Sequence, residues 1–218
     1  MLSITLVIII ITCIISLAAF NNAKVKNDLI FYPPAISFNK QYYRFITSGF
    51  IHGDYIHLIF NMLSFYFFGP AVEQTFLYIF GAGTGKILYL VLYFTALIAA
   101  LLPTYAKNKE NSYYMSLGAS GAVSAVIFAA IMFQPQLSIG FLFIPFIRIP
   151  GFIFGPLFLI ISAFLDKRGG GNINHSAHIW GALYGVAFVI ITCFIFTDYN
   201  AVSIFINQIS NYFSDLGF

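Results

Sequence analysis

Long stretches without a charged residue dominate this chain of 218 residues, and they most constrain how it can fold. A helix needs about 20 mostly apolar residues to cross the hydrocarbon core of a bilayer. With 60% hydrophobic and 8% charged residues and a mean hydropathy of +0.90, the chain is predicted to be a multi-pass integral membrane protein. The stretches long enough for a span are Met1–Ala23, Tyr55–Val72, Ile87–Ala106, Asn111–Ile147, Ile149–Leu165 and Asn172–Thr197.

Each stretch is expected to form one transmembrane helix. The fourth is too long for a single span, so its helix is expected to end near Gln134, where Pro135 breaks it, with Gln136–Pro150 as a connection. The predicted fold is an all-α membrane protein, a compact bundle of six transmembrane helices that forms one domain over residues 1–197.

The two ends of the chain need separate interpretations. Met1–Phe20 has the apolar character of a signal peptide, but the first cation is Lys24, so a retained first helix is favoured. Residues 198–218 are predicted to form an amphipathic tail with a short helix on the membrane interface, with packing or partner binding as alternatives. Its apolar residues recur at helical spacing: Val202, Phe205, Ile206, Ile209, Phe213 and Leu216.

The net charge and the two cysteines argue against a nucleic-acid partner and against a disulfide bond. The net charge of only +3 provides no basic patch, so nucleic acid is not expected to be a partner. Cys13 and Cys193 lie within predicted spans, where a thiol behaves as a small apolar side chain, and no disulfide is expected.

Polar motifs stand at the starts of the second, fourth and sixth predicted spans. Each pair of spans returns the chain to the same face, so these three starts are expected to share one membrane leaflet. Ionisable groups at membrane depth usually mark functional sites. The motifs are His52-x4-His57-x3-Asn61, Gly118-Ala119-Ser120-Gly121 and Ala177-His178-x2-Gly181.

Ser120 is the candidate nucleophile, because its small neighbours leave the hydroxyl uncrowded. His178 offers the base that a serine nucleophile needs. The simpler alternative is that the glycines serve only helix packing, and residue 122 is Ala where the nucleophile elbow of soluble hydrolases requires Gly. Gly181 and Gly185 repeat the four-residue spacing of Ala177, which predicts close packing of the sixth helix on a neighbour and brings His178 within reach of Ser120.

Together, the three motifs resemble the signature set of rhomboid intramembrane serine proteases, over roughly residues 40 to 190. The resemblance implies a Ser-His dyad, with Ser120 as nucleophile and His178 as general base. It also implies an oxyanion hole formed by His57, Asn61 and the backbone N–H of Ser120. No cofactor and no metal ion are expected.

The resemblance assigns supporting roles to other residues. His52 resembles the structural histidine of the family's second helix, and Arg44 the arginine of the family's Trp-Arg pair in the first loop. Glu73 is expected to anchor the far end of the second helix, about 24 Å from His57 at 1.5 Å per residue. The glycines of the motifs are expected to allow close approach near the site: Gly118, Gly121, Gly181 and Gly185.

Three departures from the family pattern are evident. Residue 124 is Ser where several relatives have a Tyr that stacks on the catalytic histidine, so His178 must be oriented in another way. Tyr43 replaces the usual Trp. The segment Gln74–Lys86 is longer and more apolar than expected between the second and third helices; its glycines resemble a P-loop, but Phe80 and Ile87 replace required residues, so no nucleotide is expected.

The predicted function is intramembrane serine endopeptidase, acting on transmembrane protein substrates within the lipid bilayer. A catalytically inactive rhomboid-like chaperone is one alternative, but such relatives lose the Ser or the His, and this chain has both. A proton-coupled transporter using His52, His57 and His178 lacks an intramembrane carboxylate other than Glu73. A metal site made of these histidines would leave Ser120 unexplained.

The family resemblance and the distribution of Lys and Arg residues indicate opposite orientations in the membrane. The resemblance implies an active site toward the extracytoplasmic face. However, eight of the ten Lys and Arg residues fall in loops on the predicted active-site side, which the positive-inside rule would place in the cytoplasm. We follow the resemblance, because Arg44 is expected to have a structural role.

Overall fold

The computed structural model describes residues 3–141, 144–169 and 173–217. The predicted boundaries at Met1, Asn172 and Phe218 fall outside these residues. Within the described part of the chain, four helices are long and apolar enough to cross a membrane. They are α1 (Ile4–Asn21), α5 (Tyr55–Phe80), α6 (Ala82–Asn108) and α9 (His175–Phe196).

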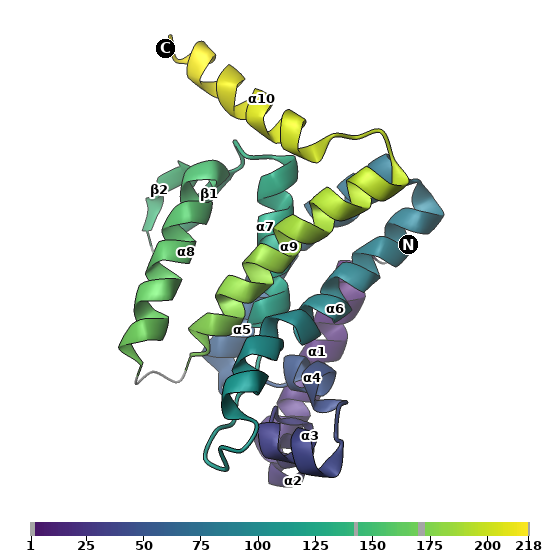
Figure 1. Ribbon diagram of the computed structural model, residues 1–218, viewed down its shortest axis with the longest axis vertical. Helices are drawn as coiled ribbons and strands as arrows, with labels where there is room; N and C mark the ends of the chain where they lie inside the picture. Colours follow the sequence, from purple (N-terminus) through teal and green to yellow (C-terminus); the bar gives the residue numbers. More distant parts are fainter. Residues whose placement is uncertain (1–2, 142–143, 170–172, 218) are drawn as a thin grey trace.

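Two further helices correspond to the fourth and fifth predicted spans. The first, α7 (Ser120–Phe133), is apolar but has only 14 residues, about 21 Å at 1.5 Å per residue. The second, α8 (Gly151–Arg168), has 18 residues and ends in three charged ones. Every residue of α7 except Ser120 and Ile127 is buried, so this helix is enclosed by the others (Figure 1). The count of six spans stays a prediction.

The connection between α5 and α6 corrects the sequence prediction. The second helix was expected to end at Val72 and the third to begin at Ile87, but α5 continues to Phe80 and only Gly81 separates it from α6. Gly81 has a φ of 79°, which allows the reversal. The apolar segment after Glu73 is therefore helical, and the glycines that resemble a P-loop form a helix turn and the first turn of α6.

The segment between the first and second predicted spans contains short helices. They are α2 (Ala23–Leu29), α3 (Pro33–Asn39), α4 (Arg44–Thr47) and the 3-10 helix η1 (Ser48–Phe50). Arg44 is buried and donates from Nη1 to the carbonyls of Asn27 and Ile30, at 2.8 and 2.7 Å. This guanidinium thereby ties α4 to the end of α2.

The connection expected over Gln136–Pro150 contains a two-stranded antiparallel sheet, formed by β1 (Ser138–Phe141) and β2 (Ile144–Pro150), in which Ser138 lies opposite Pro150. The chain ends in a helix, α10 (Ala201–Asp215). Gln208 in α10 donates from its amide to the Phe133 carbonyl at 3.1 Å. This helix therefore packs at the end of α7 opposite Ser120 (Figure 1).

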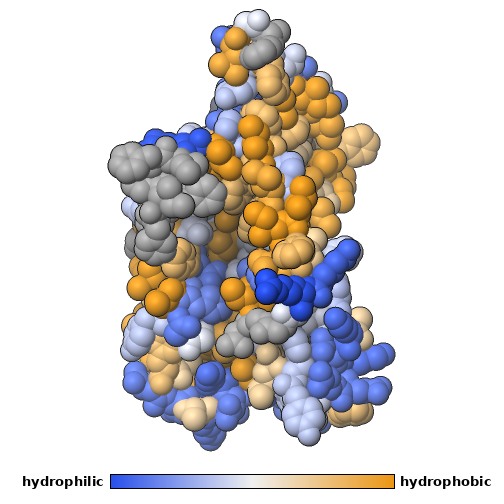
Figure 2. Space-filling model, turned by 90° about the vertical axis from the view of Figure 1, so that its left-hand side faces the viewer, coloured by the Kyte–Doolittle hydropathy of each residue, from blue (hydrophilic) through white to orange (hydrophobic). Residues whose placement is uncertain are grey.

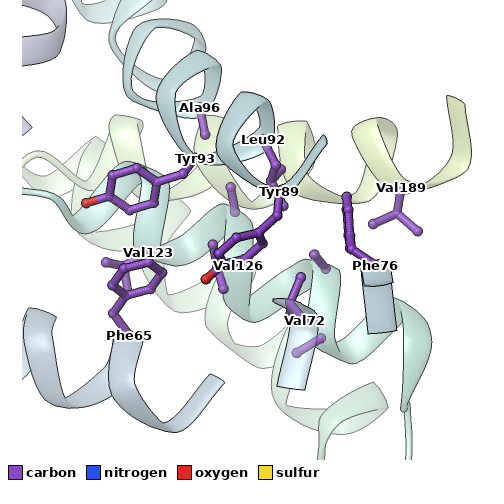
Figure 3. Close-up of a cluster of buried hydrophobic side chains, with 14 of the residues drawn as sticks. Phe65, Val72, Phe76, Tyr89, Leu92, Tyr93, Ala96, Val123, Val126 and Val189 are labelled. Carbon is purple, nitrogen blue, oxygen red and sulfur yellow. The ribbon is translucent and has the colours of Figure 1, made fainter. Parts of the chain in front are cut away.

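The core lies where α5, α6, α7 and α9 meet. Large side chains from α5 and α6 interleave there with smaller ones from α7 and α9 (Figure 3). The Phe65 and Tyr93 rings stack with centroids 4.9 Å apart. Members of this cluster include Phe65, Val72, Phe76, Tyr89, Leu92, Tyr93, Ala96, Val123, Val126 and Val189.

Glu73 fastens α1 to α5. Its carboxylate accepts hydrogen bonds from the backbone N–H groups of Ile4 and Thr5, at 2.8 and 3.0 Å, and from the Thr5 hydroxyl at 2.8 Å. A carboxylate at a helix N-terminus is stabilised by the free N–H groups and the helix dipole. This agrees with the structural role expected of Glu73, which lies in the half of α5 away from His57, ahead of the last turns of the helix.

The surface divides along the long axis of the molecule. Hydrophilic side chains gather at the end that carries α2, α3 and α4, whereas apolar ones cover much of the rest of the face in Figure 2. Exposed apolar residues are what lipid contact requires of a membrane helix, as in Ile14 of α1 and Phe194 of α9.

Candidate active site

Ser120 is the first residue of α7, and the turn before it explains its surroundings. Gly118 has a φ of 115°, a conformation that side chains other than glycine rarely adopt. A Cβ at this position would lie 2.7 and 2.8 Å from Cε1 and Nε2 of His57. Gly118 therefore allows the turn and lets the His57 ring approach the start of α7.

His178 lies in the first turn of α9. Asn174 caps that helix, its side-chain oxygen accepting from the Ala177 N–H at 3.0 Å. The Nε2 atom of His178 is 2.8 Å from Oγ of Ser120. Both side chains are half-buried. The two residues belong to separate helices and are 58 positions apart in sequence. Only the packing of α9 on α7 brings them together.

That packing depends on glycines, as the small-residue spacing predicts. A Cβ at Gly181 would lie 2.8 Å from the carbonyl carbon of Gly121, and one at Gly185 would lie 2.7 Å from that of Ala125. A Cβ at Gly121 would meet Cβ of Ala100 of α6 at 2.6 Å, so this glycine also lets α6 lie close to α7. Backbone contacts backbone along this interface, which fixes the distance between α7 and α9.

His52 links α1 to the turn before α7 and is almost fully buried, with 1% of its surface exposed. The Ala119 N–H donates to its Nε2 at 3.4 Å, so Nδ1 carries the proton and donates to the Ser16 hydroxyl at 2.9 Å. Ser16 in turn donates to the Phe50 carbonyl at 2.9 Å. Burial, and secondarily the nearby His57, lower the pKa of His52 to about 3.

His57 and Asn61 lie on α5, one turn apart. Asp54 caps the helix by accepting from the His57 N–H at 2.8 Å. The buried Asn61 amide donates to the His57 carbonyl at 2.9 Å. Among the residues that the structure describes, neither side chain forms a hydrogen bond with Ser120. His57 is nevertheless next to the turn that precedes Ser120, through its contact with Gly118.

A small cavity adjoins Ser120, with a volume of about 20 Å³. This is room for about one water molecule. Its lining combines backbone-rich and apolar surface from η1, α6, the turn before α7 and α9: Ser48, Leu97, Ala100, Leu117, Gly118, Gly121 and Asn174.

Sequence reasoning missed two groups of neighbours. Ser16 was not singled out, although Thr5, Thr12 and Ser16 form a buried polar face on the otherwise apolar α1, and their spacing is a detectable signal. The rings of Phe158 and His175, which flank His178, were also missed. In the described residues, no group of three or more His, Cys, Asp or Glu is placed to hold a metal ion.

Comparison with known proteins agrees with the resemblance. The sequence matches the family model of the Rhomboid domain over residues 39–195, which is most of the chain. It is 37% identical over 147 residues to RHOMBOID-like protein 12, mitochondrial, of Arabidopsis thaliana, covering 63% of this chain and 42% of that protein. It is 26% identical over 158 residues to rhomboid protease GlpG of Haemophilus influenzae, covering 72% and 73%. The chain thus spans less than half of its Arabidopsis relative. The match to the family model covers the motifs around Ser120 and His178, and the chain belongs to the rhomboid family.

Proposed function

We propose that this chain is an intramembrane serine endopeptidase that cleaves transmembrane segments of membrane proteins through a dyad of Ser120 and His178. The observation that carries the proposal is the 2.8 Å separation of Nε2 of His178 and Oγ of Ser120. This distance suits proton transfer between a nucleophile and its general base. Membership of the rhomboid family and the name of the Haemophilus relative, a rhomboid protease, support the same conclusion.

The geometry supports a two-step hydrolysis. Nε2 of His178 takes the Ser120 proton as Oγ attacks the scissile carbonyl carbon, and the carbonyl oxygen becomes an oxyanion. The imidazolium then gives its proton to the leaving amine, which departs and leaves an acyl group on Ser120. Water activated by His178 attacks this ester, releases the second product as a carboxylic acid and restores the hydroxyl.

The start of α7 suits the stabilisation of an oxyanion. The first N–H groups of a helix have no intrahelical partner, and the helix dipole adds positive potential there. The Ser120 N–H belongs to this set. In this proposal it donates to the oxyanion together with His57 and Asn61, each side chain turning its free N–H toward the bound carbonyl.

The site favours a small substrate side chain before the cut. The cavity beside Ser120 holds only about 20 Å³, which leaves no room for a large side chain without rearrangement of its walls.

A transmembrane substrate is supported by the position of Ser120 and His178 at one end of apolar helices. No cofactor takes part in this chemistry, so treatment with EDTA is expected to leave the rate of cleavage unchanged.

The decisive experiment combines cleavage with covalent labelling. Detergent-purified protein is incubated with a transmembrane substrate and, separately, with a fluorescent fluorophosphonate that reacts with activated serines. The unaltered protein is expected to show both activities, and Ser120→Ala and His178→Ala to show neither while keeping their thermal stability. Cleavage by Ser120→Ala would overturn the dyad; an unaltered protein without either activity would favour the inactive chaperone-like alternative.

We also propose an arrangement in the membrane. Residues 1–197 form one six-span domain in which α7 and α8 are the fourth and fifth spans, and residues 198–218 form a tail whose helix α10 lies on the interface. The alternation of exposed Val202 and Ile206 with exposed Ser203 and Asn207 supports an interfacial helix.

The active site is proposed to face the extracytoplasmic side. Arg44 is buried and hydrogen-bonded to backbone carbonyls, so it reports on folding rather than topology. Orientation can be measured by replacing exposed residues with cysteine and adding a membrane-impermeant maleimide to intact cells. Ser112→Cys, on the active-site side, is expected to react, and Lys86→Cys, at the opposite end, is not; the reverse pattern would place the site in the cytoplasm.

A further inference from the structure

Hydrogen bonds alone do not fix the orientation of the His178 ring. Its Nε2 faces Ser120 at 2.8 Å. In a Ser-His-Asp triad, a carboxylate bound to Nδ1 holds the imidazole in its tautomer and orientation. Among the described residues, no hydrogen bond is formed by Nδ1 of His178. Rotation of the ring about its Cβ–Cγ bond must therefore be limited by packing.

Two rings flank the imidazole. His175 lies one turn earlier on the same helix, its ring centroid 5.7 Å away and nearly perpendicular at 86°. Phe158 comes from α8, with its centroid 6.1 Å away and its plane inclined by 31°. The helix that carries Ser120 contributes no ring at the next turn, because residue 124 is a buried serine. Phe158 is thus the flanking ring that comes from outside α9, the helix that carries His178.

Phe158 is itself held in place. Its ring stacks on that of Phe154, 5.7 Å away at 30°, and is tilted against that of Phe128 of α7, 5.6 Å away at 56°. Phe128 belongs to a buried cluster with Ile131 and Ala182, on which Phe158 packs. Two aromatic neighbours therefore fix the ring that meets the imidazole, which gives it a defined position rather than a loose contact.

We propose that Phe158 is a positioning residue, whose ring keeps the imidazole of His178 aligned with Ser120. This inference rests on the proposed function and adds that α8 takes part in the alignment. Loss of the ring would let His178 rotate away from Oγ while the bond-making groups remain present. Because misplacement of reacting groups by about 1 Å can cost on the order of a hundredfold in rate, the effect should appear in turnover.

The test compares substitutions at Phe158 that keep or remove the ring. Phe158→Leu retains apolar bulk without an aromatic face, whereas Phe158→Tyr keeps that face. The matched control is Phe164→Leu, the same exchange on the same helix at a side chain that is 63% exposed. Each protein is assayed for kcat, for KM with a transmembrane substrate, and for the rate of fluorophosphonate labelling, which requires no substrate docking.

We expect Phe158→Leu to lower kcat and the labelling rate at least about tenfold with little change in KM, since the loss concerns alignment rather than binding. Phe158→Tyr is expected to recover most of this loss, and Phe164→Leu to match the unaltered protein. Unchanged kcat in Phe158→Leu would overturn the proposal. So would a raised KM with normal labelling, which would make Phe158 a substrate contact, or equal damage in Phe158→Tyr.

Two further outcomes are separable. If Phe158→Leu does not fold, Phe158→Met takes its place as a ringless apolar side chain, and misfolding of both would show that the ring serves stability and overturn the proposal. Failure of the proposed function would look different. In that case, the unaltered protein would neither cleave nor label, and Ser120→Ala would be indistinguishable from it.

Discussion

The α7–α9 pair and the neighbouring α8 are packed in different ways (Figure 1). All but two residues of α7 are buried, and Gly181 and Gly185 of α9 bring the two backbones into contact. In α8, only Gly151, Gly155 and Ser162 are buried out of 18 residues. Elements with few buried contacts are displaced at low free-energy cost. The reacting side chains therefore stand on the closely packed pair, whereas α8 is held at the site mainly by its Phe158 ring, which packs on Phe128.

The largest effect is expected from filling the α7–α9 contact. In Gly181→Val, a Cβ would lie 2.8 Å from the Gly121 carbonyl carbon, so the helices must separate. His178 then moves away from Ser120, although neither side chain is altered. A separation of about 1 Å costs on the order of a hundredfold in rate, and the lost packing should lower thermal stability as well. Thermal unfolding and cleavage are measured together; normal cleavage would contradict the interpretation of a closely packed pair.

A smaller effect, confined to the reaction, is expected from Asn61→Ala. Asn61 is buried on α5, and its proposed partner exists only when an oxyanion forms. Loss of an oxyanion-hole donor costs about 2.7–4 kcal/mol of barrier, so kcat should fall on the order of a hundredfold or more while KM and stability stay near normal. Steady-state kinetics distinguish this outcome from a raised KM, which would assign Asn61 to substrate positioning.

The link from His52 to the turn before α7 should appear as pH dependence. Its pKa is about 3 in the folded protein because of burial, below the ordinary value of 6.5. Below pH 6.5 the unfolded chain binds a proton that the folded protein does not, so the stabilisation present above that pH is lost as the pH falls. The slope is about 1.4 kcal/mol per pH unit for one proton. Thermal unfolding between pH 7.5 and 4.5 should show a shallower loss in His52→Gln.

This comparison with His52→Gln isolates one histidine, because the other titrating groups are common to both proteins. Equal slopes would mean that His52 is not held in its neutral form by the fold.

The smallest effect is expected from a substitution at Gly155 of α8. A Cβ at Gly155 would lie 3.5 Å from Cε1 of Phe128, an ordinary contact distance. Gly155→Ala should therefore leave cleavage unchanged and alter the free energy of unfolding by less than about 1 kcal/mol, toward greater stability, since alanine favours a helix. A loss comparable with that of Gly181→Val would erase the difference between the two regions.

The sequence predicted the parts of the site that depend on repeating patterns. The four-residue spacing of Ala177, Gly181 and Gly185 predicted backbone contact, and the placement of Ser120 and His178 at the starts of even-numbered spans predicted a shared leaflet. The apolar stretches located the helices but not all their ends. Residues Phe76 to Phe80 are apolar enough to belong to a helix, and only Gly81 marks the turn to the next one.

Other features depended on contacts that periodicity does not reveal. The short helices α2 and α4 are too short to be stable alone, and the buried Arg44 guanidinium joins them. The paired strands β1 and β2 lie in a segment with prolines, which predicted only a connection. Phe158 of α8 contacts His178 of α9, and because it is one of four phenylalanines in an apolar stretch, the sequence gave no sign of that neighbour.

The single-residue junction at Gly81 has a consequence for how the chain enters a membrane. Since α5 and α6 have no intervening segment, the two helices are expected to insert together as one hairpin rather than one after the other. Gly85, whose missing side chain lets α6 meet the backbone of Phe76, holds the hairpin shut immediately beyond the turn. An epitope tag or protease site inserted after Phe80 would therefore separate α5 from α6. Topology mapping by insertion at this end of the two helices requires a site elsewhere in the chain.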